Sequence, residues 1–344
     1  MSATPVLVAM SGGVDSSVAA ALLLQQGYEV TGVTMKLWGG VQDSGCCSVS
    51  DVEDARRVAD ELGIPHHVFN FGDEFEEHVV APYVDAHSEG LTPNPCIECN
   101  RHLKFDKLLR RATALGFDLV ATGHHAQIVE HDGHRFIARG AADAKDQSYV
   151  LHMLTQDQLA QTLLPLGGMT KDRVRELAAE LGLRTADKPD SQDVCFIAHT
   201  SGGRERFLSE RVELTPGRVV DAAGDEVGRI DAVELVTIGQ RKGLGVSGNA
   251  EPLFATAVDA STATVTIGPR RDLLTDSSPI TDLDWVAGPV AETVDVQVSA
   301  HGRTAPAQVV GAEVHWTDPH RRVAPGQSIV FYAGDRVVGS ATAA

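Results

Sequence analysis

Residues 1 to about 200 alternate short apolar runs with segments in which apolar positions recur at helical spacing. The apolar runs predict strands at Val6–Met10, Val30–Met35, Val68–Phe71 and Leu119–Thr122. The periodic segments predict helices at Ser16–Gln26, Asp51–Leu62, Glu74–Val84 and Phe105–Leu115, the second of them capped by Ser50 or Asp51. Strands that alternate with helices are typical of βαβ units. We therefore expect a doubly wound parallel sheet that binds ligands beyond the carboxyl ends of its strands.

After about residue 205 the pattern changes to short β-rich runs separated by turn sequences such as TPG, GLGVSGN and APGQ. These runs predict strands at Arg218–Val220, Val233–Ile238, Ala255–Val258, Thr264–Ile267, Val294–Val298, Ala307–Val310 and Ile329–Tyr332. We expect three domains: an α/β domain at 1–204, a small β-rich domain at 205–272, and a β-barrel or sandwich at 273–344.

The chain has 344 residues, of which 43% are hydrophobic and 22% are charged, and this is typical of a globular protein with buried cores. Its longest apolar runs, such as Ala19–Leu24, are far shorter than the ~20 residues of a membrane-spanning helix. The N-terminus lacks the basic region of a signal peptide. We therefore expect a cytoplasmic protein in which free thiols are the default state of cysteine.

The formal net charge is −18, which disfavours a general nucleic-acid coat and favours an enzyme of small substrates. A local basic patch can nevertheless follow a phosphate backbone. One candidate patch is Arg321–Arg322, and the other consists of Arg101, Lys104, Lys107, Arg110 and Arg111. Each is also compatible with an ordinary solvated surface.

A glycine-rich loop, Ser11-Gly12-Gly13-Val14-Asp15-Ser16, lies between the first predicted strand and helix. Its glycines allow backbone N–H groups to approach an anion, and the helix N-terminus adds positive partial charge. The sequence matches neither the P-loop nor the dinucleotide-binding pattern. S-G-G-x-D-S resembles the pyrophosphate loop of ATP pyrophosphatases, which cleave ATP between the α- and β-phosphates and leave AMP on an acceptor oxygen. Asp15 would hold Mg²⁺ or orient the loop.

Two further residues suit the nucleotide by their position. Met35 ends the second predicted strand and would contact the adenine, although core packing explains it equally well. Gly123 ends another strand, where a missing side chain would leave room for the ribose or base. His124 and His125 follow it and are either polar ligands or exposed loop residues.

Cys96 and Cys99 form a C-x-x-C pair in NPCIECN, which the pattern places in a loop before a basic helix. Of the remaining cysteines, Cys46 and Cys47 are adjacent, and Cys195 lies far along the chain. A structural zinc site usually takes two ligand pairs, so zinc is disfavoured. The basic residues and the helix start near Cys99 would favour its nucleophilic thiolate. Together with an AMP-forming loop, reactive cysteines suggest that ATP activates a carbonyl oxygen, which sulfur then replaces.

The chain resembles the family of tRNA-specific 2-thiouridylases (MnmA) along nearly its whole length. The resemblance is carried by AMSGGVDSSVAA, CCSVSDVEDARRVADELGIPHHV, TPNPCIECNRHLKFDKLL, DLVATGHHA, AKDQSYVLHML, KPDSQDVCFI, TIGQRKGLGV and PGQSIVFYAGDRVVG. It implies an N-terminal PP-loop domain that binds ATP, a small central domain and a C-terminal β-barrel. It also implies ATP-dependent 2-thiolation of the wobble uridine in tRNAs for Lys, Glu and Gln, through an adenylated uridine.

The resemblance also assigns roles to individual residues. Cys99 would be the nucleophile and Cys195 the persulfide carrier, with a transient disulfide between them; attack by sulfide that Cys99 releases is the alternative. The ATP-binding residues would be Ala9, Met10, Ser11, Gly12, Gly13, Val14, Asp15, Ser16, Met35 and Gly123. The target base would contact Asn94, Pro95 and Cys96, and the tRNA would contact His124, Lys145, Asp146, Gln147, His301, Gly302 and Gln327.

Two positions depart from the family pattern. Cys96 stands where members carry an aspartate, and His301-Gly302 stands where members often carry Arg-Tyr. Cys96, Cys99 and Cys195 are also a candidate ligand set for an iron–sulfur cluster, beside the ATP and Mg²⁺ expected as cofactors. The expected partners are tRNA and a sulfur-relay protein or cysteine desulfurase, with the protein a monomer that does not bind membranes. The alternatives are an AMP-forming ligase of a small metabolite and a metal-binding interaction protein.

Overall fold

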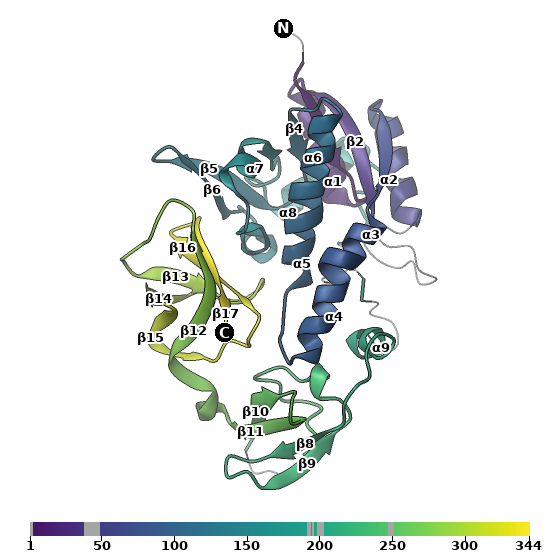
Figure 1. Ribbon diagram of the computed structural model, residues 1–344. Coiled ribbons are helices and arrows are strands. Elements are labelled where there is room, and N and C mark those ends of the chain that lie inside the picture. Colours follow the sequence, from purple (N-terminus) through teal and green to yellow (C-terminus); the bar gives the residue numbers. More distant parts are fainter. Residues whose placement is uncertain (1–2, 38–48, 191–193, 195, 198–202, 247–250) are drawn as a thin grey trace. The chain divides into compact units, whose positions relative to one another are not determined.

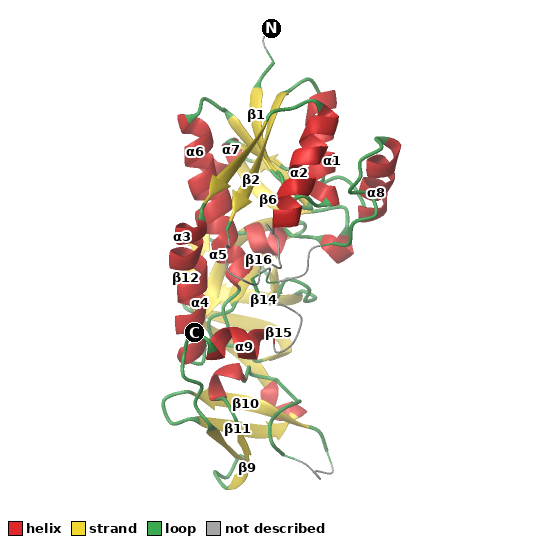
Figure 2. Cartoon of the chain, turned by 90° about the vertical axis from the view of Figure 1, so that its right-hand side faces the viewer, coloured by secondary structure: helices red, strands yellow, loops and turns green. Residues whose placement is uncertain are grey.

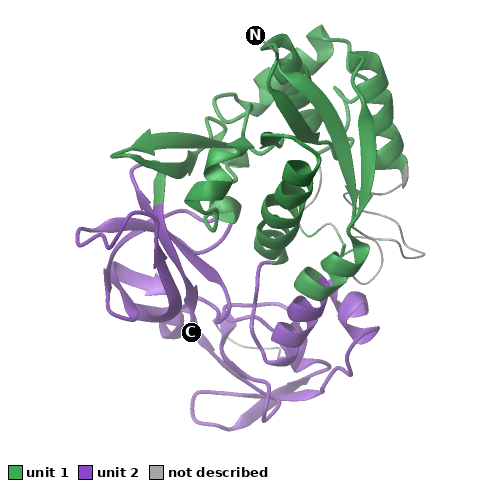
Figure 3. Cartoon of the chain, turned by 45° about the horizontal axis from the view of Figure 1, so that its top comes forward, with its two compact units in different colours: residues 1–79, 95–198, 335–337 green, residues 80–94, 199–334, 338–344 purple. Residues whose placement is uncertain are grey.

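The computed structural model describes residues 3–37, 49–190, 194, 196–197, 203–246 and 251–344 (Figure 1). The chain forms two compact units (Figure 3). The first unit contains residues 1–79, 95–198 and 335–337, and the second contains residues 80–94, 199–334 and 338–344. The chain therefore passes between the units several times.

The first unit is built on a five-stranded parallel sheet with the strand order β3-β2-β1-β4-β7. The strands are β1 (Pro5–Ala9), β2 (Glu29–Lys36), β3 (His66–Asn70), β4 (Leu119–Ala121) and β7 (Thr162–Leu163). The helices are α1 (Val14–Gln25), α2 (Val49–Leu62), α3 (Gly72–Phe75), α5 (Pro95–Glu98), α6 (Leu108–Ala114), α7 (Gln156–Ala160) and α8 (Lys171–Glu180). A π-helical stretch, Glu76–Val80, follows α3, and another, Cys99–Lys107, joins α5 to α6. The strand order reverses between β1 and β4, so the predicted doubly wound sheet is confirmed.

An apolar core packs α1, α2 and α8 against this sheet. Val6 of β1, Val18 of α1, Ala55 of α2 and Val174 of α8 all belong to it and are fully buried. Figure 2 shows α1 and α2 on one side of β1 and β2, with α6 on the other side. The loops after β1 and β4 therefore lie at the same edge of the sheet, at the point where the strand order reverses. Ligands bind at this point in such sheets.

All four predicted helices begin earlier than the sequence predicted, α1 at Val14 and the helix predicted at Glu74–Val84 at Gly72. α2 begins at Val49, so the predicted cap, Ser50 or Asp51, lies inside its first turn. The helix predicted at Phe105–Leu115 begins at Pro95. Proline is favoured in a first helical turn, where its missing N–H needs no partner. The TPNP sequence therefore marks the start of this helix.

The second unit contains a four-stranded sheet and a closed β-barrel. Its helices are α4 (Ala81–Ser88) and α9 (Gly203–Ser209). The sheet has the order β10-β11-β8-β9 and consists of β8 (Gly217–Val220), β9 (Glu226–Ile230), β10 (Leu253–Asp259) and β11 (Thr264–Pro269). The barrel has the order β12-β15-β14-β13-β16-β17 and consists of β12 (Leu274–Trp285), β13 (Val294–Gln297), β14 (Ala305–Val310), β15 (Glu313–Arg321), β16 (Ser328–Ala333) and β17 (Arg336–Ala343). Pairing of β12 with β17 closes it, so the C-terminal structure is a barrel and not a sandwich.

Several elements escaped the sequence pattern, namely the strands β7, β9, β12, β15 and β17, the helices α7, α8 and α9, and a hairpin in the first unit. The first unit contains a hairpin of β5 (Ala126–His131) and β6 (His134–Arg139). Its turn, Asp132-Gly133, has φ of 49° and 78°, and an Asp-Gly pair is a hairpin signal that could have revealed it. The strand predicted at Val233–Ile238 is wrong, because Val233–Leu235 forms a short 3₁₀ turn. The buried Glu234 carboxylate accepts the Thr215 N–H at 3.1 Å and holds this turn.

Candidate functional site

The glycine loop between β1 and α1 is held by its own residues. Gly12 has a φ of +71°, and a Cβ atom there would lie 2.2 Å from the backbone oxygen of Asp51 in α2. The Ser11 N–H donates to Ser16 Oγ at 3.1 Å, and Ser16 Oγ donates to the Gly13 carbonyl at 3.2 Å. Only glycine therefore fits at position 12, and hydrogen bonds within the loop hold its shape.

The start of α1 is suited to an anion. Gly13 is its N-cap, and no side chain caps the helix from that position. The first N–H groups of a helix have no partner within it, and the aligned peptide dipoles add positive partial charge there. Because the glycine loop leads directly into this helix, a phosphate group bound to the loop would meet both effects.

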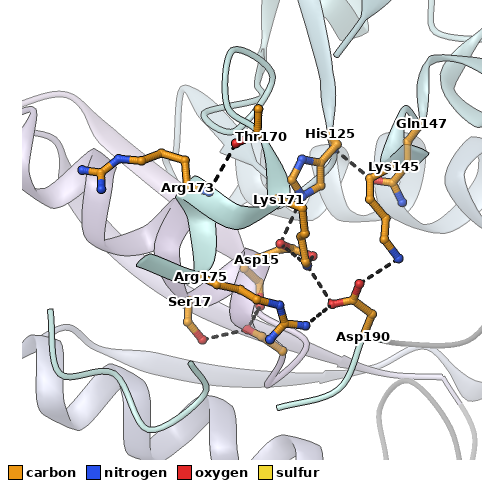
Figure 4. Close-up of polar contacts among 12 residues, drawn as sticks. Asp15, Ser17, His125, Lys145, Gln147, Thr170, Lys171, Arg173, Arg175 and Asp190 are labelled. Carbon is orange, nitrogen blue, oxygen red and sulfur yellow. Dashed lines mark hydrogen bonds and ion pairs between the residues drawn. The ribbon is translucent and has the colours of Figure 1, made fainter. Parts of the chain in front are cut away.

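Asp15, in the first turn of α1, is held by two side chains that are distant in sequence. Lys171 Nζ lies 2.7 Å from each carboxylate oxygen of Asp15, and His125 Nε2 lies 3.1 Å from one of them (Figure 4). Burial opposes ionisation, but hydrogen bonds from His125 and Lys171 hold the pKa of Asp15 below its ordinary value. These contacts fit a residue that orients the loop. The alternative role of Asp15 as a Mg²⁺ ligand stays a prediction.

Asp190 shares Lys171 with Asp15. Its carboxylate lies 2.9 Å from Lys171 Nζ, 2.7 Å from Lys145 Nζ and 2.7 Å from an Arg175 guanidinium nitrogen (Figure 4). Although burial opposes the shift, contacts with Lys145 and Lys171 lower the pKa of Asp190 to about 2. Sequence reasoning missed this cluster, because a lysine in an amphipathic helix is usually a solvated residue and nothing in the chain marks Lys171 as different.

Lys188 ties the segment that contains Asp190 to the other side of the loop. Its Nζ donates to the Gly12 carbonyl at 3.0 Å, to Asp51 at 2.7 Å and to Asp54 at 2.8 Å. Burial works against the charge, but hydrogen bonds to both aspartates raise the pKa of Lys188. The ammonium therefore stays charged and links the loop to α2. Lys188 begins the KPDSQDVCFI stretch, but the sequence did not indicate these partners.

Four other residues predicted to bind ATP lie near the same edge of the sheet. Ala9 ends β1 and Met10 follows it. Met35, in β2, is 7% exposed, which agrees with core packing. Gly123 follows β4, and a Cβ atom there would lie 2.7 Å from the Ser16 backbone nitrogen. The first turn of α1 therefore leaves no room for a side chain at position 123.

Cys96 and Cys99 lie in the first two turns of the helix that begins at Pro95, and not in a loop. Residues three positions apart are neighbours on one face of a helix. Cys96 is partly exposed and Cys99 is 8% exposed. Cys99 is also the first residue of the π-helical stretch, a conformation that is rare and often found at functional sites. Asn94 precedes this helix in the chain and belongs to the second unit.

Two of the positive charges expected to favour the Cys99 thiolate are paired with carboxylates. Arg101 lies 3.4 Å from Glu98, and Lys107 lies 2.7 Å from Glu74. Each pairing compensates much of the cation's field before it reaches the thiol. The electrostatic argument for Cys99 is therefore weaker than the sequence suggested, while its place in the second turn of a helix is established.

The first unit also contains four of the residues predicted to contact tRNA. His124 is 7% exposed, and burial lowers its pKa well below the ordinary value. Asp146 lies 3.1 Å from Arg139, and its side chain is 7% exposed. The Gln147 side-chain oxygen accepts the His125 N–H at 2.9 Å. His124 and Gln147 thus lie at the loop after β4, whereas Asp146 contacts Arg139 at the end of β6. The fourth is Lys145, bound to Asp190 as described above.

The second unit contains the other three residues predicted to contact tRNA. His301 is exposed. A Cβ atom at Gly302 would lie 2.5 Å from Ser299 Oγ, so this turn leaves little room for a side chain at position 302. The carbonyl of Gln327 accepts the Ala343 N–H at 2.9 Å. The assignment of these residues to tRNA binding stays a prediction.

Cys195, predicted as the persulfide carrier, lies outside the described residues, as do Cys46 and Cys47. The predicted Cys99–Cys195 disulfide and the predicted three-cysteine cluster therefore stay predictions. Among the residues whose placement is described, no group of three or more His, Cys, Asp and Glu could hold a metal ion. No helix in the described part of the chain is long and apolar enough to cross a membrane.

Known families cover nearly the whole chain. A tRNA methyl transferase HUP domain model matches residues 4–199, a tRNA methyl transferase PRC-barrel domain model matches 205–269, and an aminomethyltransferase beta-barrel domain model matches 276–343. A tRNA-specific 2-thiouridylase MnmA of Clostridium perfringens is 43% identical, covering 98% of both chains. That of Chloroflexus aggregans is 47% identical, covering 97% of this chain and 96% of that protein. The chain belongs to the tRNA-specific 2-thiouridylase (MnmA) family.

Proposed function

We propose that this protein is a sulfurtransferase that uses ATP to replace the C2 oxygen of a uridine in tRNA with sulfur. The observation that carries this proposal is identity of 43–47% to 2-thiouridylases over nearly the full chain. The glycine loop supports it, because it joins β1 to α1 at the point where ligands bind in a doubly wound sheet.

The substrate is proposed to be the wobble uridine in tRNAs for Lys, Glu and Gln. ATP would lie against the loop, with Met35 and Gly123 beside it, and would bring Mg²⁺ on its own phosphate oxygens. Asn94, Pro95 and Cys96 would line the target base, which must leave the anticodon stack to react. The remaining contacts with tRNA would come from His124, Lys145, Asp146, Gln147, His301, Gly302 and Gln327.

The reaction would proceed in three displacements. The uridine O2 attacks the α-phosphorus, the bond to the β-phosphate oxygen breaks, and pyrophosphate leaves while the uracil N3 proton is released. The terminal sulfur of a persulfide on Cys195 then attacks C2, and AMP leaves with the oxygen. Finally the Cys99 thiolate attacks the Cys195 sulfur and breaks the S–S bond, which leaves 2-thiouridine and a disulfide for an external dithiol to reduce. Attack by released sulfide is the alternative for the sulfur step.

A sulfur-relay protein or cysteine desulfurase is proposed to load Cys195. The protein is proposed to act as a cytoplasmic monomer, with domains at 1–204, 205–272 and 273–344. A cluster bound by Cys96, Cys99 and Cys195 stays a hypothesis that iron and sulfide analysis of anaerobically purified protein would test.

The test is to incubate the full-length protein with ATP, a sulfur donor and unmodified tRNA, and to measure 2-thiouridine in the nucleoside digest. We expect 2-thiouridine together with one AMP per thiolation. Cys99→Ser and Cys195→Ser should each abolish the product and leave ATP binding unchanged. Because two matched domain models are described as methyl transferase domains, a parallel reaction with S-adenosylmethionine serves as a control and should leave the uridine unmethylated. AMP formation on a small metabolite without tRNA thiolation would instead identify an AMP-forming ligase.

A further inference from the structure

The Lys171 ammonium lies where the surrounding partial charges are positive. Without carboxylates nearby, this position would be unfavourable for a cation. Lys171 is the first residue of α8, and its ammonium reaches Asp15 in the first turn of α1. The positive ends of two helix dipoles therefore meet at this ammonium. The Lys171 side chain is 14% exposed, so water screens these dipoles only in part.

The charges around Lys171 leave a local excess of positive charge. Lys171, Lys145 and Arg175 carry three positive charges, and Asp15 and Asp190 carry two negative charges. The helix N-termini add further positive partial charge. A positively charged cluster beside a glycine loop attracts a polyanionic ligand more strongly than a neutral ligand.

Lys171 can leave either aspartate without leaving a carboxylate unpaired. Asp15 would keep its contact with His125 at 3.1 Å. Asp190 would keep Lys145 at 2.7 Å and Arg175 at 2.7 Å. In Figure 4 these partners approach the two carboxylates from different elements. The ammonium at the end of a flexible stem is thus free to exchange a carboxylate for a phosphate.

We propose that Lys171 binds the β- and γ-phosphates of ATP, and that Asp15 and Asp190 hold its ammonium beside the glycine loop until ATP arrives. The proposal rests on the proposed function, since it requires ATP at the loop. These two phosphates leave as pyrophosphate when AMP is transferred, and a fixed cation beside them stabilises the charge that develops on the leaving group. Lys171 is then a substrate-binding residue, with Asp15 and Asp190 as positioning residues.

Titration calorimetry of the full-length protein with ATP and with AMP tests this assignment. We expect Lys171→Ala to weaken ATP binding roughly 10- to 100-fold, as for the loss of one hydrogen bond to a charged group, and to leave AMP binding unchanged. Lys171→Arg should recover part of the loss. Arg173→Ala is the matched control, because Arg173 lies on the same helix, pairs with the exposed Glu180 and points away from the cluster (Figure 4); it should leave both ligands unaffected.

A measurement on the unmodified chain covers the case in which Lys171→Ala does not fold. Reductive methylation followed by peptide mass spectrometry should show Lys171 protected by ATP and by pyrophosphate, and not by AMP. Three results would overturn the assignment even though tRNA thiolation persists. They are an unchanged ATP affinity in Lys171→Ala, an equal loss of affinity for ATP and for AMP in that variant, and no protection of Lys171 from methylation by ATP. A wild-type protein that neither binds ATP nor thiolates tRNA would instead overturn the proposed function.

Discussion

The two glycines of the loop should respond to alanine to very different degrees. At Gly12 the backbone has a φ of +71°, which costs a residue with a side chain about 1–2 kcal/mol. The new Cβ atom would also lie 2.2 Å from the Asp51 backbone oxygen, so α2 must move away from the loop. Overpacking of this kind costs about 1–3 kcal/mol.

Gly13 is the matched control on the adjacent residue. Its φ of −93° and ψ of 167° are ordinary extended values, and the nearest atom to an added Cβ is Ser11 Oγ at 3.5 Å. Gly13→Ala should therefore change stability by no more than about 1 kcal/mol. Gly12→Ala should cost about 2–5 kcal/mol, which for a unit of this size lowers the melting temperature by roughly 5–15 °C.

Circular dichroism at 222 nm follows this change, since most helices described here belong to the first unit. Titration with ATP then separates stability from binding. The Gly12→Ala variant should lose both stability and ATP affinity. Gly13→Ala should melt like the wild type, and any loss of ATP affinity would report a phosphate at its Cβ position. Equal melting temperatures for the two variants would refute the argument from φ and close approach.

Three further predictions concern other parts of the molecule. Gly123→Ala should weaken ATP binding because its Cβ would press on the first turn of α1, whereas Gly168→Ala, with no atom within 4 Å, should not; calorimetry measures both. Burial and a nearby arginine lower the pKa of His87 to about 4, so the unfolded chain takes up a proton between about pH 6.5 and pH 4 that the folded chain refuses. Stability should fall by up to about 3 kcal/mol over that range, and denaturation of His87→Phe should show a shallower dependence on pH. Cys96→Ser should retain most thiolation, and complete loss would make Cys96 essential.

The sequence predicted the parts of the fold that depend on local patterns. Short apolar runs followed by glycine and a periodic helix marked β1, the loop and α1 to within a few residues. The barrel strands β13, β14 and β16 were found in the same way. Val233 was assigned wrongly, because a buried β-branched residue fits a strand and a 3₁₀ turn equally well, and only its neighbours in space decide between them.

The charged part of the site could not be predicted in this way. Lys171 and Asp15 are 156 positions apart, and Lys188 and Gly12 are 176 positions apart. Lys171 has no sequence neighbour that distinguishes it from a surface residue, and Lys188, although it begins the KPDSQDVCFI stretch, has no neighbour that indicates its partners. Folding of the sheet brings both segments to the loop after β1, so the partner of each ion is fixed by topology.

A net charge of −18 does not argue against a polyanionic substrate. Net charge sums ions over the whole surface, whereas a bound phosphate responds to the few charges within about one Debye length, roughly 8–10 Å at moderate salt. At Lys171 three cations face two carboxylates beside two helix N-termini, so the local field is positive. An acidic chain can therefore bind ATP at this loop, and removal of a distant surface aspartate should change that affinity far less than removal of Lys171.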